Sequence, residues 1–392
     1  MAKRSITEAE VRGKRALVRV DFNVPLRDGE VADDTRIRAA LPTIEDLRRR
    51  GAAVVLATHL GRPKGKPDPA FSVMPIAHRL GELLGAPIAT VPVVVGAEAE
   101  RAAAELRPGD VLLIENTRFE PGEESNDAEL AVALSRLGDL YVNDAFGAAH
   151  RAHASTVGVA ELLPSYAGLL LQREVTALSG LLHEPARPVV AILGGAKVSD
   201  KLAVVDHLLG RVDALLLGGG MANTLLLAQG HEIGSSLAEP DRVKQARKLV
   251  DRANESGVQL LTPSDVVTAE SLDSTGTTIT PIDDVSSRQA IFDIGPDTIA
   301  RFCQQIASAE TVFWNGPMGV FERPAFANGT LAIARCVADA PGFTIVGGGD
   351  SLAAIEAAGV GELIDHISTG GGASLEFLEG RSLPGIAVLP DA

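Results

Sequence analysis

The chain has 392 residues, of which 46% are hydrophobic and 22% charged, and its formal net charge is −15. That length exceeds what one hydrophobic core usually organises and favours two domains of about 200 residues each. The strong negative charge argues against nucleic acid or an anionic membrane as partner, because either would be repelled by the surface as a whole.

The sequence also favours a cytoplasmic protein. The N-terminus has no apolar signal segment, and no window approaches the roughly 18 apolar residues of a membrane span. Cys303 and Cys336 are far apart and form no C-x-x-C pair. This spacing argues against a metal cluster or a disulfide framework and fits a reducing compartment.

Short apolar runs alternate with amphipathic stretches along the whole chain. The expected strands are 16–20, 53–57, 111–114, 140–142, 189–193, 214–217, 311–313 and 343–346. Several are unbroken apolar runs, which is typical of strands buried on both faces of a parallel sheet. Helical patterns lie between them, at 43–50, 127–137, 203–209 and 241–256. Asp28-Gly29 predicts a tight hairpin turn near the start of the chain.

The pattern predicts an α/β protein with two doubly wound, Rossmann-like parallel-sheet lobes, joined by a helix and separated by a cleft. The boundary is expected near the helical stretch 166–183, which two prolines, Pro185 and Pro188, bring to an end. The expected divisions are an N-terminal lobe at 1–170, a linking helix or hinge at 171–187, a C-terminal lobe at 188–375 and a tail at 376–392 that packs back on the body.

Ligands of open α/β sheets bind beyond the carboxyl ends of the strands. In the first half of the chain these positions are polar and rich in cations. They include Asp21, Asn23, Arg36, His59, Arg62, Arg118 and Arg151. Any one of these arginines, taken alone, is more commonly a solvated loop residue. As a set they predict a site for a ligand with several negative charges, because the arginine fork binds carboxylate or phosphate oxygens in pairs.

In the second half the corresponding positions are glycine-rich. The segments are 194–201, 218–221, 314–317, 347–351 and 369–373. Glycine lets the backbone approach a phosphate, and a following helix N-terminus offers free N–H groups. We expect Lys197 and Lys201, one helical turn apart, to reach the same polyphosphate. Asp350 is the expected ligand of Mg²⁺, which favours one or two carboxylates plus phosphate oxygens.

The two halves together indicate phosphoryl transfer between a small polyanion and a magnesium nucleotide. Two other functions remain open at this point: a non-catalytic nucleotide-binding protein on the same fold, and an NAD-dependent oxidoreductase. The sequence contains neither G-x-x-x-x-G-K-[ST] nor G-x-G-x-x-G. Their absence disfavours a P-loop NTPase, a protein kinase and a standard dinucleotide site.

Ordered motifs from about residue 15 to about residue 380 resemble the phosphoglycerate kinase family. They are 19–25, 58–63, 115–119, 143–147, 150–155, 194–201, 313–317, 319–322, 347–350 and 368–374. The resemblance implies the glycolytic reaction 1,3-bisphosphoglycerate + ADP ⇌ 3-phosphoglycerate + ATP, by in-line transfer after hinge closure. It also implies Mg²⁺ with the nucleotide and a cytoplasmic monomer.

The same resemblance implies a role for each site residue. The glycerate would be held by Asp21, Asn23, Arg36, His59, Arg62, Arg118 and Arg151. The nucleotide would be held by Gly195, Lys197, Lys201, Asn315, Glu322, Gly348, Gly349, Asp350 and Ser351, with Asp350 placing the metal.

Both reacting oxygens are ionised near neutral pH, so no general base is needed, and catalysis must come from positioning and charge neutralisation. We assign that neutralisation to Arg36, Lys197, the backbone N–H groups of Gly371 and Gly372, and Mg²⁺.

Overall fold

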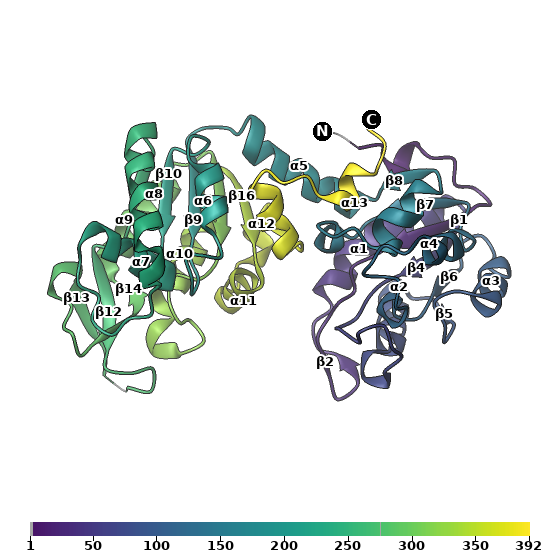
Figure 1. The fold of residues 1–392 in the computed structure, drawn as a ribbon, viewed down its shortest axis with the longest axis horizontal. Coiled ribbons are helices and arrows are strands. Elements are labelled where there is room, and N and C mark those ends of the chain that lie inside the picture. The colour runs from purple at the N-terminus through teal and green to yellow at the C-terminus, as the bar shows by residue number, and fades with distance from the viewer. Residues whose placement is uncertain (1–2, 275) are drawn as a thin grey trace. The chain divides into compact units, whose positions relative to one another are not determined.

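The computed structural model describes residues 3–274 and 276–392, so the first two residues of the expected N-terminal lobe lie outside it. The chain forms two compact units (Figure 1). Unit 1 comprises Met1–Thr176 and Ser382–Ala392, and unit 2 comprises Ala177–Arg381. The first passage between them lies within helix α5 (Leu169–His183), and the second follows Arg381.

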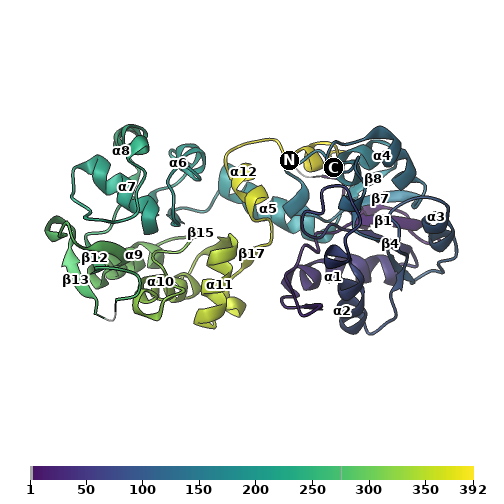
Figure 2. The same ribbon diagram turned by 60° about the horizontal axis from the view of Figure 1, so that its bottom comes forward.

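Unit 1 is built on a six-stranded parallel sheet in the order β5-β6-β4-β1-β7-β8. Figure 2 shows α1 and α2 on one face and α4 on the other. The strands are β1 (Arg15–Arg19), β4 (Ala53–Ala57), β5 (Ala89–Thr90), β6 (Val111–Leu113), β7 (Leu140–Asn143) and β8 (Ser165–Ala167). All five residues of β4 are buried, as its unbroken apolar run predicted.

The helices of unit 1 are α1 (Thr35–Arg49), α2 (Met74–Leu84), α3 (Ala97–Ala104), α4 (Ala128–Ser135) and α13 (Pro384–Ala387). The prediction for α1 was wrong at its start, which lies eight residues earlier than expected, with Pro42 inside the helix. Ile37, Ala40, Ile44 and Leu47 are fully buried at helical spacing. Their burial outweighs the hydrogen bond that proline removes.

The hairpin prediction is confirmed. Strands β2 (Leu26–Arg27) and β3 (Glu30–Val31) pair antiparallel across Asp28-Gly29. Both turn residues have positive φ, 52° at Asp28 and 81° at Gly29. This is the conformation that Asp-Gly favours in a two-residue hairpin.

Unit 2 has a second six-stranded parallel sheet, in the order β11-β10-β9-β15-β16-β17. Helices α9, α10 and α11 lie on one face, and α6, α7 and α8 on the other (Figure 2). The strands are β9 (Val189–Leu193), β10 (Ala214–Leu217), β11 (Gln259–Leu261), β15 (Thr311–Asn315), β16 (Phe343–Gly347) and β17 (His366–Ser368). The helices are α6 (Leu202–Leu208), α7 (Gly219–Gln229), α8 (Val243–Ser256), α9 (Pro296–Ala307), α10 (Asn328–Ala338), α11 (Gly349–Ala358) and α12 (Gly372–Leu378). The two parallel sheets with flanking helices confirm the expected α/β class.

Unit 2 also contains a small antiparallel sheet that the sequence analysis did not predict. Its strands, in the order β13-β12-β14, are β12 (Asp265–Ala269), β13 (Thr278–Pro281) and β14 (Ala290–Ile294). Three of the four residues of β13 are exposed, so it lacks the apolar run by which buried strands are recognised.

The expectation that the two cysteines stay unpaired was wrong. Cys303 on α9 and Cys336 on α10 form a disulfide, with their Cα atoms 5.5 Å apart. The two helices pack side by side over the sheet (Figure 2). Only this packing brings together residues that are 33 positions apart in the chain.

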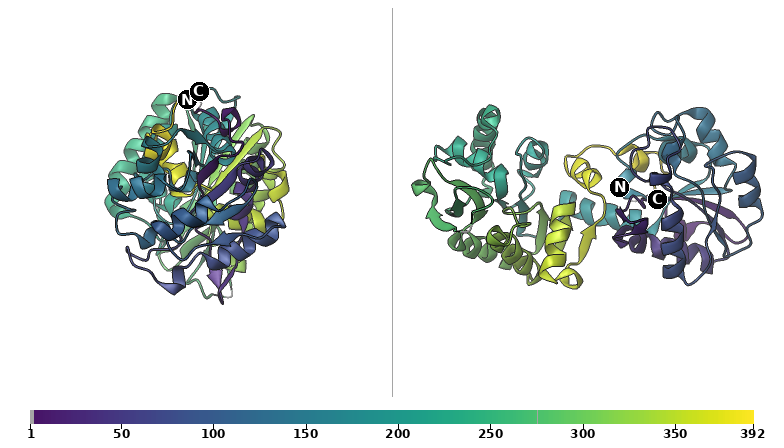
Figure 3. Two further views of the ribbon diagram at one scale, coloured as in Figure 1. Left: turned by 90° about the vertical axis from the view of Figure 1, so that its right-hand side faces the viewer. Right: turned by 90° about the horizontal axis from the view of Figure 1, so that it is seen from below.

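The end of the chain returns to unit 1, as its yellow segment shows in the right-hand view of Figure 3. Lys3 and Asp391 form an antiparallel bridge and an ion pair of 2.8 Å. Gly385 donates from its backbone N–H to the carbonyl of Ala149 and accepts from Asn143 at the end of β7. Within the described residues, no helix combines the length and apolarity needed to cross a membrane.

Candidate functional site

The sheet order of unit 1 places polar loops together. Strand β1 lies between β4 and β7, and β6 follows β4. All four strands are parallel, so the loops after them emerge at one edge of the sheet. Six of the seven predicted glycerate residues lie in these loops, and the seventh, Arg36, is on α1.

An ion pair joins α1 to the loop after β1. The Arg36 guanidinium lies 3.0 Å from the Asp21 carboxylate and 3.4 Å from the backbone carbonyl of Asn23, to which it also donates. The other Asp21 oxygen is 3.8 Å from Nδ1 of His59, in the loop after β4. Two strand ends and one helix therefore meet at Asp21.

Gly61 connects the next two predicted residues. Its N–H donates to the Asn23 side chain at 2.9 Å, and its carbonyl accepts from Arg118 at 2.7 Å. Its φ is +59°, and a Cβ there would lie 2.3 Å from the ring of Phe71. Only glycine suits this position. Because it has no side chain, the backbone of Gly61 can bind both Asn23 and Arg118.

Asn116 supports this arrangement, and the sequence analysis assigned it no role. Its side chain is fully buried and exchanges hydrogen bonds with the backbone N–H and carbonyl of Leu60. It also accepts from the backbone N–H of Arg118, two residues on. The signal available in the sequence was a polar amide directly after a buried strand.

Arg62 and Arg151 are exposed. Arg62 makes no hydrogen bond or ion pair with the residues that the structure describes, whereas Arg151 donates to His150 at 3.1 Å. Arg118 is 8% exposed and pairs with Glu124 at 3.2 Å. The cluster therefore combines a buried arginine fixed by an ion pair with arginines that are exposed to solvent.

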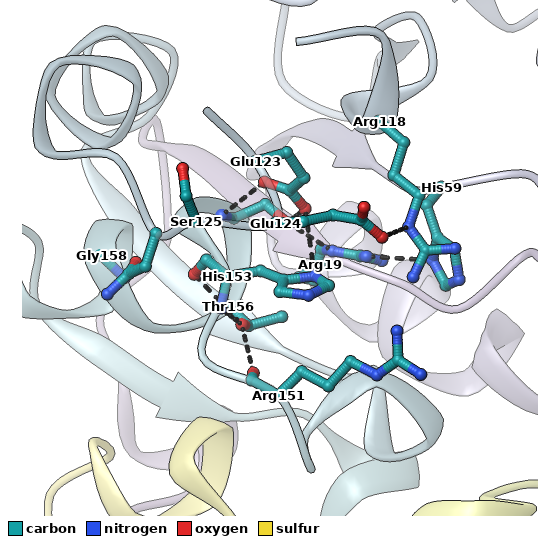
Figure 4. Close-up of polar contacts among 12 residues, drawn as sticks. Arg19, His59, Arg118, Glu123, Glu124, Ser125, Arg151, His153, Thr156 and Gly158 are labelled. Carbon is teal, nitrogen blue, oxygen red and sulfur yellow. Dashed lines mark hydrogen bonds and ion pairs between the residues drawn. The ribbon is translucent and has the colours of Figure 1, made fainter. Parts of the chain in front are cut away.

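Two histidines, His59 and His153, lie among Arg19, Arg118 and Arg151 in this cationic cluster (Figure 4). Burial, reinforced by the charges of Arg19, Arg118 and Arg36, holds the pKa of His59 well below its usual value. Burial and neighbouring arginines lower the pKa of His153 to about 4. The positive charge here is therefore carried by arginine alone.

Unit 2 has a pocket of about 330 Å³. Three of its lining residues, Gly195, Glu322 and Asp350, are predicted nucleotide residues. Its apolar walls are formed by Leu237, Pro263, Leu272, Ile291, Phe292 and Val320. A flat apolar group such as a nucleotide base fits such walls, with polar groups at the rim.

Glycines bring two loops of this pocket into contact. Gly219, the first residue of α7, has φ +66°, and a Cβ on it would lie 2.7 Å from the carbonyl oxygen of Gly195. The N-terminus of α7 and the loop after β9 therefore meet at the pocket. Free N–H groups at a helix start favour an anion.

The two lysines expected to share one polyphosphate lie in different environments. Residues 197–201 form a turn before α6 rather than a helix, so the one-turn spacing that we expected is wrong. Lys197 is exposed. Lys201 is buried and donates to the carbonyls of Gly194 at 2.6 Å and Asn315 at 2.8 Å. Burial lowers the pKa of Lys201 to about 8, opposed by the charges of Asp350 and Asp200.

The loop bearing Lys197 is held by a residue that the sequence analysis missed. Glu239 accepts hydrogen bonds from the Ser199 N–H at 2.8 Å and from its hydroxyl at 2.6 Å. These bonds favour the ionised form of Glu239, whose pKa is lowered although desolvation opposes the shift. Little in the sequence indicated this role, because Glu239 is a single acidic residue in a loop far along the chain from Ser199.

Two further predicted nucleotide residues are buried in the scaffold. Asn315 donates to the carbonyl of Gly347 at 2.9 Å, and Ser351 accepts from the N–H of Gly316 at 2.6 Å. The first bond ties the end of β15 to the end of β16, and the second ties the residue after β15 to helix α11. Beside them, Gly348 has φ +91°, and Gly349 and Asp350 begin helix α11 with Asp350 exposed.

Gly371 and Gly372 lie at the start of α12, where Gly371 has φ +55°. A Cβ on either would meet no atom within 4 Å. The backbone at this turn is therefore open on its side-chain face.

Asp293 is a buried carboxylate in the pocket wall that the sequence analysis did not single out. It is 1% exposed and accepts from the N–H groups of Gly329 at 2.7 Å and Ile294 at 2.9 Å. Burial raises the pKa of Asp293 to about 7. A Cβ on Gly319 would lie 2.3 Å from this carboxylate, so the pocket loop packs directly against it.

The described residues contain no group of three or more histidine, cysteine, aspartate or glutamate side chains that could hold a metal by themselves. Asp350, exposed at a pocket that suits a nucleotide, offers one carboxylate. Mg²⁺ is commonly held by one carboxylate together with phosphate oxygens and water. The residues present fit that kind of ion.

Comparisons with known proteins agree with one another. A family model described as phosphoglycerate kinase matches residues 6–381. The phosphoglycerate kinase of Roseiflexus castenholzii is 56% identical over 395 residues, covering 100% of both chains. That of Rubrobacter xylanophilus is 55% identical over 392 residues, covering 100% of this chain and 99% of the other.

Solved structures give the same result. The phosphoglycerate kinase structure from Coxiella burnetii superposes with a TM-score of 0.90 at 42% identity, covering 98% of each chain. The one from Pyrococcus horikoshii gives 0.87 at 34% identity, with the same coverage. These likenesses cover both units of the fold.

Proposed function

The chain belongs to the phosphoglycerate kinase family, whose glycolytic kinases transfer a phosphoryl group between 1,3-bisphosphoglycerate with ADP and 3-phosphoglycerate with ATP, and we propose which of its residues perform each part of that reaction. The observation that carries the proposal is the cationic cluster around Gly61, in which Arg118 and the Asn23 loop are held together.

Unit 1 binds the glycerate. Arg62 and Arg151, both exposed, and Arg118 bind the phosphate and carboxylate oxygens, for which the arginine fork is suited. Asp21 accepts from the hydroxyl group of the glycerate, and Asn23 and His59 donate to its remaining oxygens. Arg36 lies at the reacting carboxyl group.

Unit 2 binds the nucleotide. The base lies against the apolar walls of the pocket, and the phosphates lie over Gly195 and the glycines at the starts of α7 and α11. Lys197, exposed at the turn before α6, pairs with the phosphates. Lys201, Asn315 and Ser351, together with Gly348 and Gly349, shape this edge through their backbone contacts.

Asp350, with Glu322 also lining the pocket, is the residue that would hold Mg²⁺. When bound, the ion would neutralise negative charge on the nucleotide phosphates.

The protein's part in the chemistry is positioning and charge neutralisation. A β-phosphate oxygen of ADP attacks the phosphorus of the acyl phosphate of 1,3-bisphosphoglycerate, and the bond to the carboxylate oxygen breaks as 3-phosphoglycerate leaves. In the reverse direction the carboxylate attacks the γ-phosphorus of ATP and ADP leaves. Neither direction needs a general base. Arg36, Lys197 and the N–H groups of Gly371 and Gly372 stabilise the charge that spreads over the transferring group. Alignment of the two reactants contributes about 7–11 kcal/mol.

The glycerate and nucleotide sites belong to different units, so we propose that in-line transfer follows a hinge movement about α5 that brings them together and excludes water. A single chain carries both sites. We therefore propose a monomer, located in the cytoplasm, as the family resemblance implies.

A coupled assay of ATP formation from 1,3-bisphosphoglycerate and ADP, with and without Mg²⁺, tests the reaction and the metal. Calorimetric titration with 3-phosphoglycerate and with ADP separately tests the division between units. Substitution of Arg62 is expected to weaken the first titration only, and substitution of Lys197 the second only. Cross-effects of equal size on both ligands would contradict the assignment.

A further inference from the structure

Arg19, the last residue of β1, is among the largest fully buried side chains of the protein, with 1% of it exposed. It lies at the inner edge of the cationic cluster, yet it is too deep to bind a ligand directly. A buried guanidinium is costly unless its N–H groups are all occupied. The partners that occupy them indicate what it does.

The Arg19 side chain extends between Glu123 and His59 (Figure 4). Its Nε donates to the hydroxyl of Ser155 at 2.8 Å, and one terminal nitrogen donates to the carbonyl of Val20. Its other terminal nitrogen is 3.1 Å from Nδ1 of His59. Each of the three guanidinium nitrogens of Arg19 therefore has a hydrogen-bond partner.

Glu123 and Ser155 hold this arrangement from behind. Glu123 is fully buried and accepts from both the hydroxyl of Ser155 at 2.5 Å and its backbone N–H at 3.0 Å. The Ser155 hydroxyl therefore donates its hydrogen bond to Glu123 and accepts one from Arg19. The result is a buried chain of hydrogen bonds that runs from Glu123 through Ser155 and Arg19 to His59.

The contact at His59 allows only one assignment of protons. An arginine nitrogen can donate but cannot accept. The Nδ1 of His59 must therefore be the acceptor, which leaves the ring proton on Nε2. In the alternative state Nδ1 would carry a proton toward Asp21, whose nearest oxygen is farther away, at 3.8 Å.

The charges that face His59 favour a neutral ring. Arg19 comes from β1, Arg36 from α1 and Arg118 from the loop after β6, and His153 also lies near. Asp21 is the carboxylate among its contacts. Burial opposes a positive charge on His59, and the three arginines would repel it further.

We propose that Arg19 is a positioning residue that fixes His59 in its neutral Nε2–H form, so that His59 offers the bound glycerate one hydrogen bond as a donor while the arginines supply the charge. The proposal rests on the function proposed above. It extends that function to a buried residue that touches no substrate and to the tautomer of one that does.

The direct test is ¹⁵N NMR of the full-length protein with labelled histidine, with the His59 signals assigned by their loss in His59→Gln. The expected wild-type spectrum has a protonated Nε2 and an unprotonated Nδ1 from about pH 5.5 to about pH 8.5, with no titration across the range. A protonated Nδ1, or an imidazolium at neutral pH, would overturn the proposal without any variant of Arg19.

Arg19→Met removes the donor and its charge. We expect the fixed tautomer to be lost, so that the single ring proton of His59 is shared between Nδ1 and Nε2, while burial, Arg118 and Arg36 keep the ring neutral. We also expect the KM for 3-phosphoglycerate to rise by roughly 3- to 10-fold, as for one lost hydrogen bond. The KM for ATP should not change. An unchanged His59 spectrum in this variant would also overturn the proposal.

Two further variants complete the design. Arg15→Met removes an arginine at the other end of β1, where it pairs with Asp139 on the surface, and should leave both the spectrum and the KM as in the wild type. If Arg19→Met does not fold, Arg19→Met with Glu123→Gln removes both buried charges, and the same outcomes apply. A wild-type KM for 3-phosphoglycerate in His59→Gln would instead contradict the substrate role of His59, while the spectra still decide the role of Arg19.

Discussion

The Arg36 guanidinium lies 3.0 Å from the Asp21 carboxylate, and this pair joins helix α1 to the loop after β1 at the centre of the cationic cluster. Arg36 keeps a third of its side chain exposed, whereas Asp21 keeps a tenth. Arg36 is therefore oriented by Asp21 and still open on one side. This is the arrangement needed for a cation that must meet charge developing on a substrate.

Arg36→Ala is expected to lower kcat by at least about 10²-fold, the loss typical of a missing transition-state donor. Folding should survive because the side chain is partly exposed. Steady-state kinetics in the coupled assay measure the loss. Arg38→Ala is the matched control, since Arg38 lies on the same helix and pairs on the surface with Asp34. A near-normal kcat in Arg36→Ala would remove this residue from the catalytic set.

Substitutions of Lys197 and Lys201 are expected to have different effects, the first on kcat and the second on stability. Lys197→Ala should lower kcat by about 10²-fold or more with little change in stability, because Lys197 is exposed and assigned to the transferring phosphate. Lys201→Met should instead lower the free energy of unfolding by about 1–3 kcal/mol, because it leaves the carbonyls of Gly194 and Asn315 without their buried donor.

Denaturant unfolding of unit 2 measures the second effect. Trp314, the only tryptophan of the chain, is fully buried in β15 and reports on that unit alone. If Lys201→Met unfolded like the wild type while losing nucleotide binding, Lys201 would act as a direct phosphate ligand rather than as a support.

The Cys303–Cys336 disulfide should stabilise unit 2. Cross-linking residues that are 33 positions apart is expected to contribute about 3–4 kcal/mol by restricting the unfolded chain. A reductant should therefore shift the Trp314 unfolding transition to lower denaturant concentration. The variant with both cysteines replaced by alanine should unfold like the reduced protein and ignore the reductant. An identical transition with and without reductant would contradict this stabilisation.

The stability of unit 2 should fall as pH rises toward neutrality. Burial raises the pKa of Asp293 from its ordinary value of 3.8 to about 7. The folded protein thus keeps a proton that the unfolded chain loses between these values. The free energy of unfolding then decreases through that window by up to about 1.4 kcal/mol per pH unit.

Trp314 unfolding curves between about pH 5 and about pH 8 check this prediction. Asp293→Asn carries no charge at any pH and should show a shallower fall. Asp251→Asn, which alters an exposed carboxylate on α8 of the same unit, should keep the wild-type slope. Equal slopes in the wild type and Asp293→Asn would mean that Asp293 is ionised throughout the range.

Local sequence patterns predicted the elements that carry the sites. The strands that precede the two sites were recognised within a few residues, because a strand buried on both faces needs an unbroken apolar run. Asp28-Gly29 identified its hairpin because few other pairs adopt positive φ at both positions. The glycine-rich segments after the strands of unit 2 likewise lie where a close backbone approach occurs, as at Gly219.

Local patterns failed where packing decided the outcome. Helix α1 extends through Pro42 because its earlier turn buries Ile37 and Ala40. The exposed strand β13 has too few buried residues to be recognised. The disulfide depends on two helices that lie side by side. The separation of 33 residues between the cysteines gives no indication of that packing.

The sequence by itself determined the two α/β sheets, the family and the residue types at the strand ends, because burial and backbone conformation are set by near neighbours along the chain. Only the tertiary structure decided which of those residues are buried and stabilise the surrounding loops, and which are exposed and free to bind a ligand. Lys201 points into the scaffold while Lys197 remains outside, and Arg19 reaches His59 from the neighbouring strand β1. Such contacts depend on strand order and side-chain direction across 40 or more positions, and no local pattern encodes them.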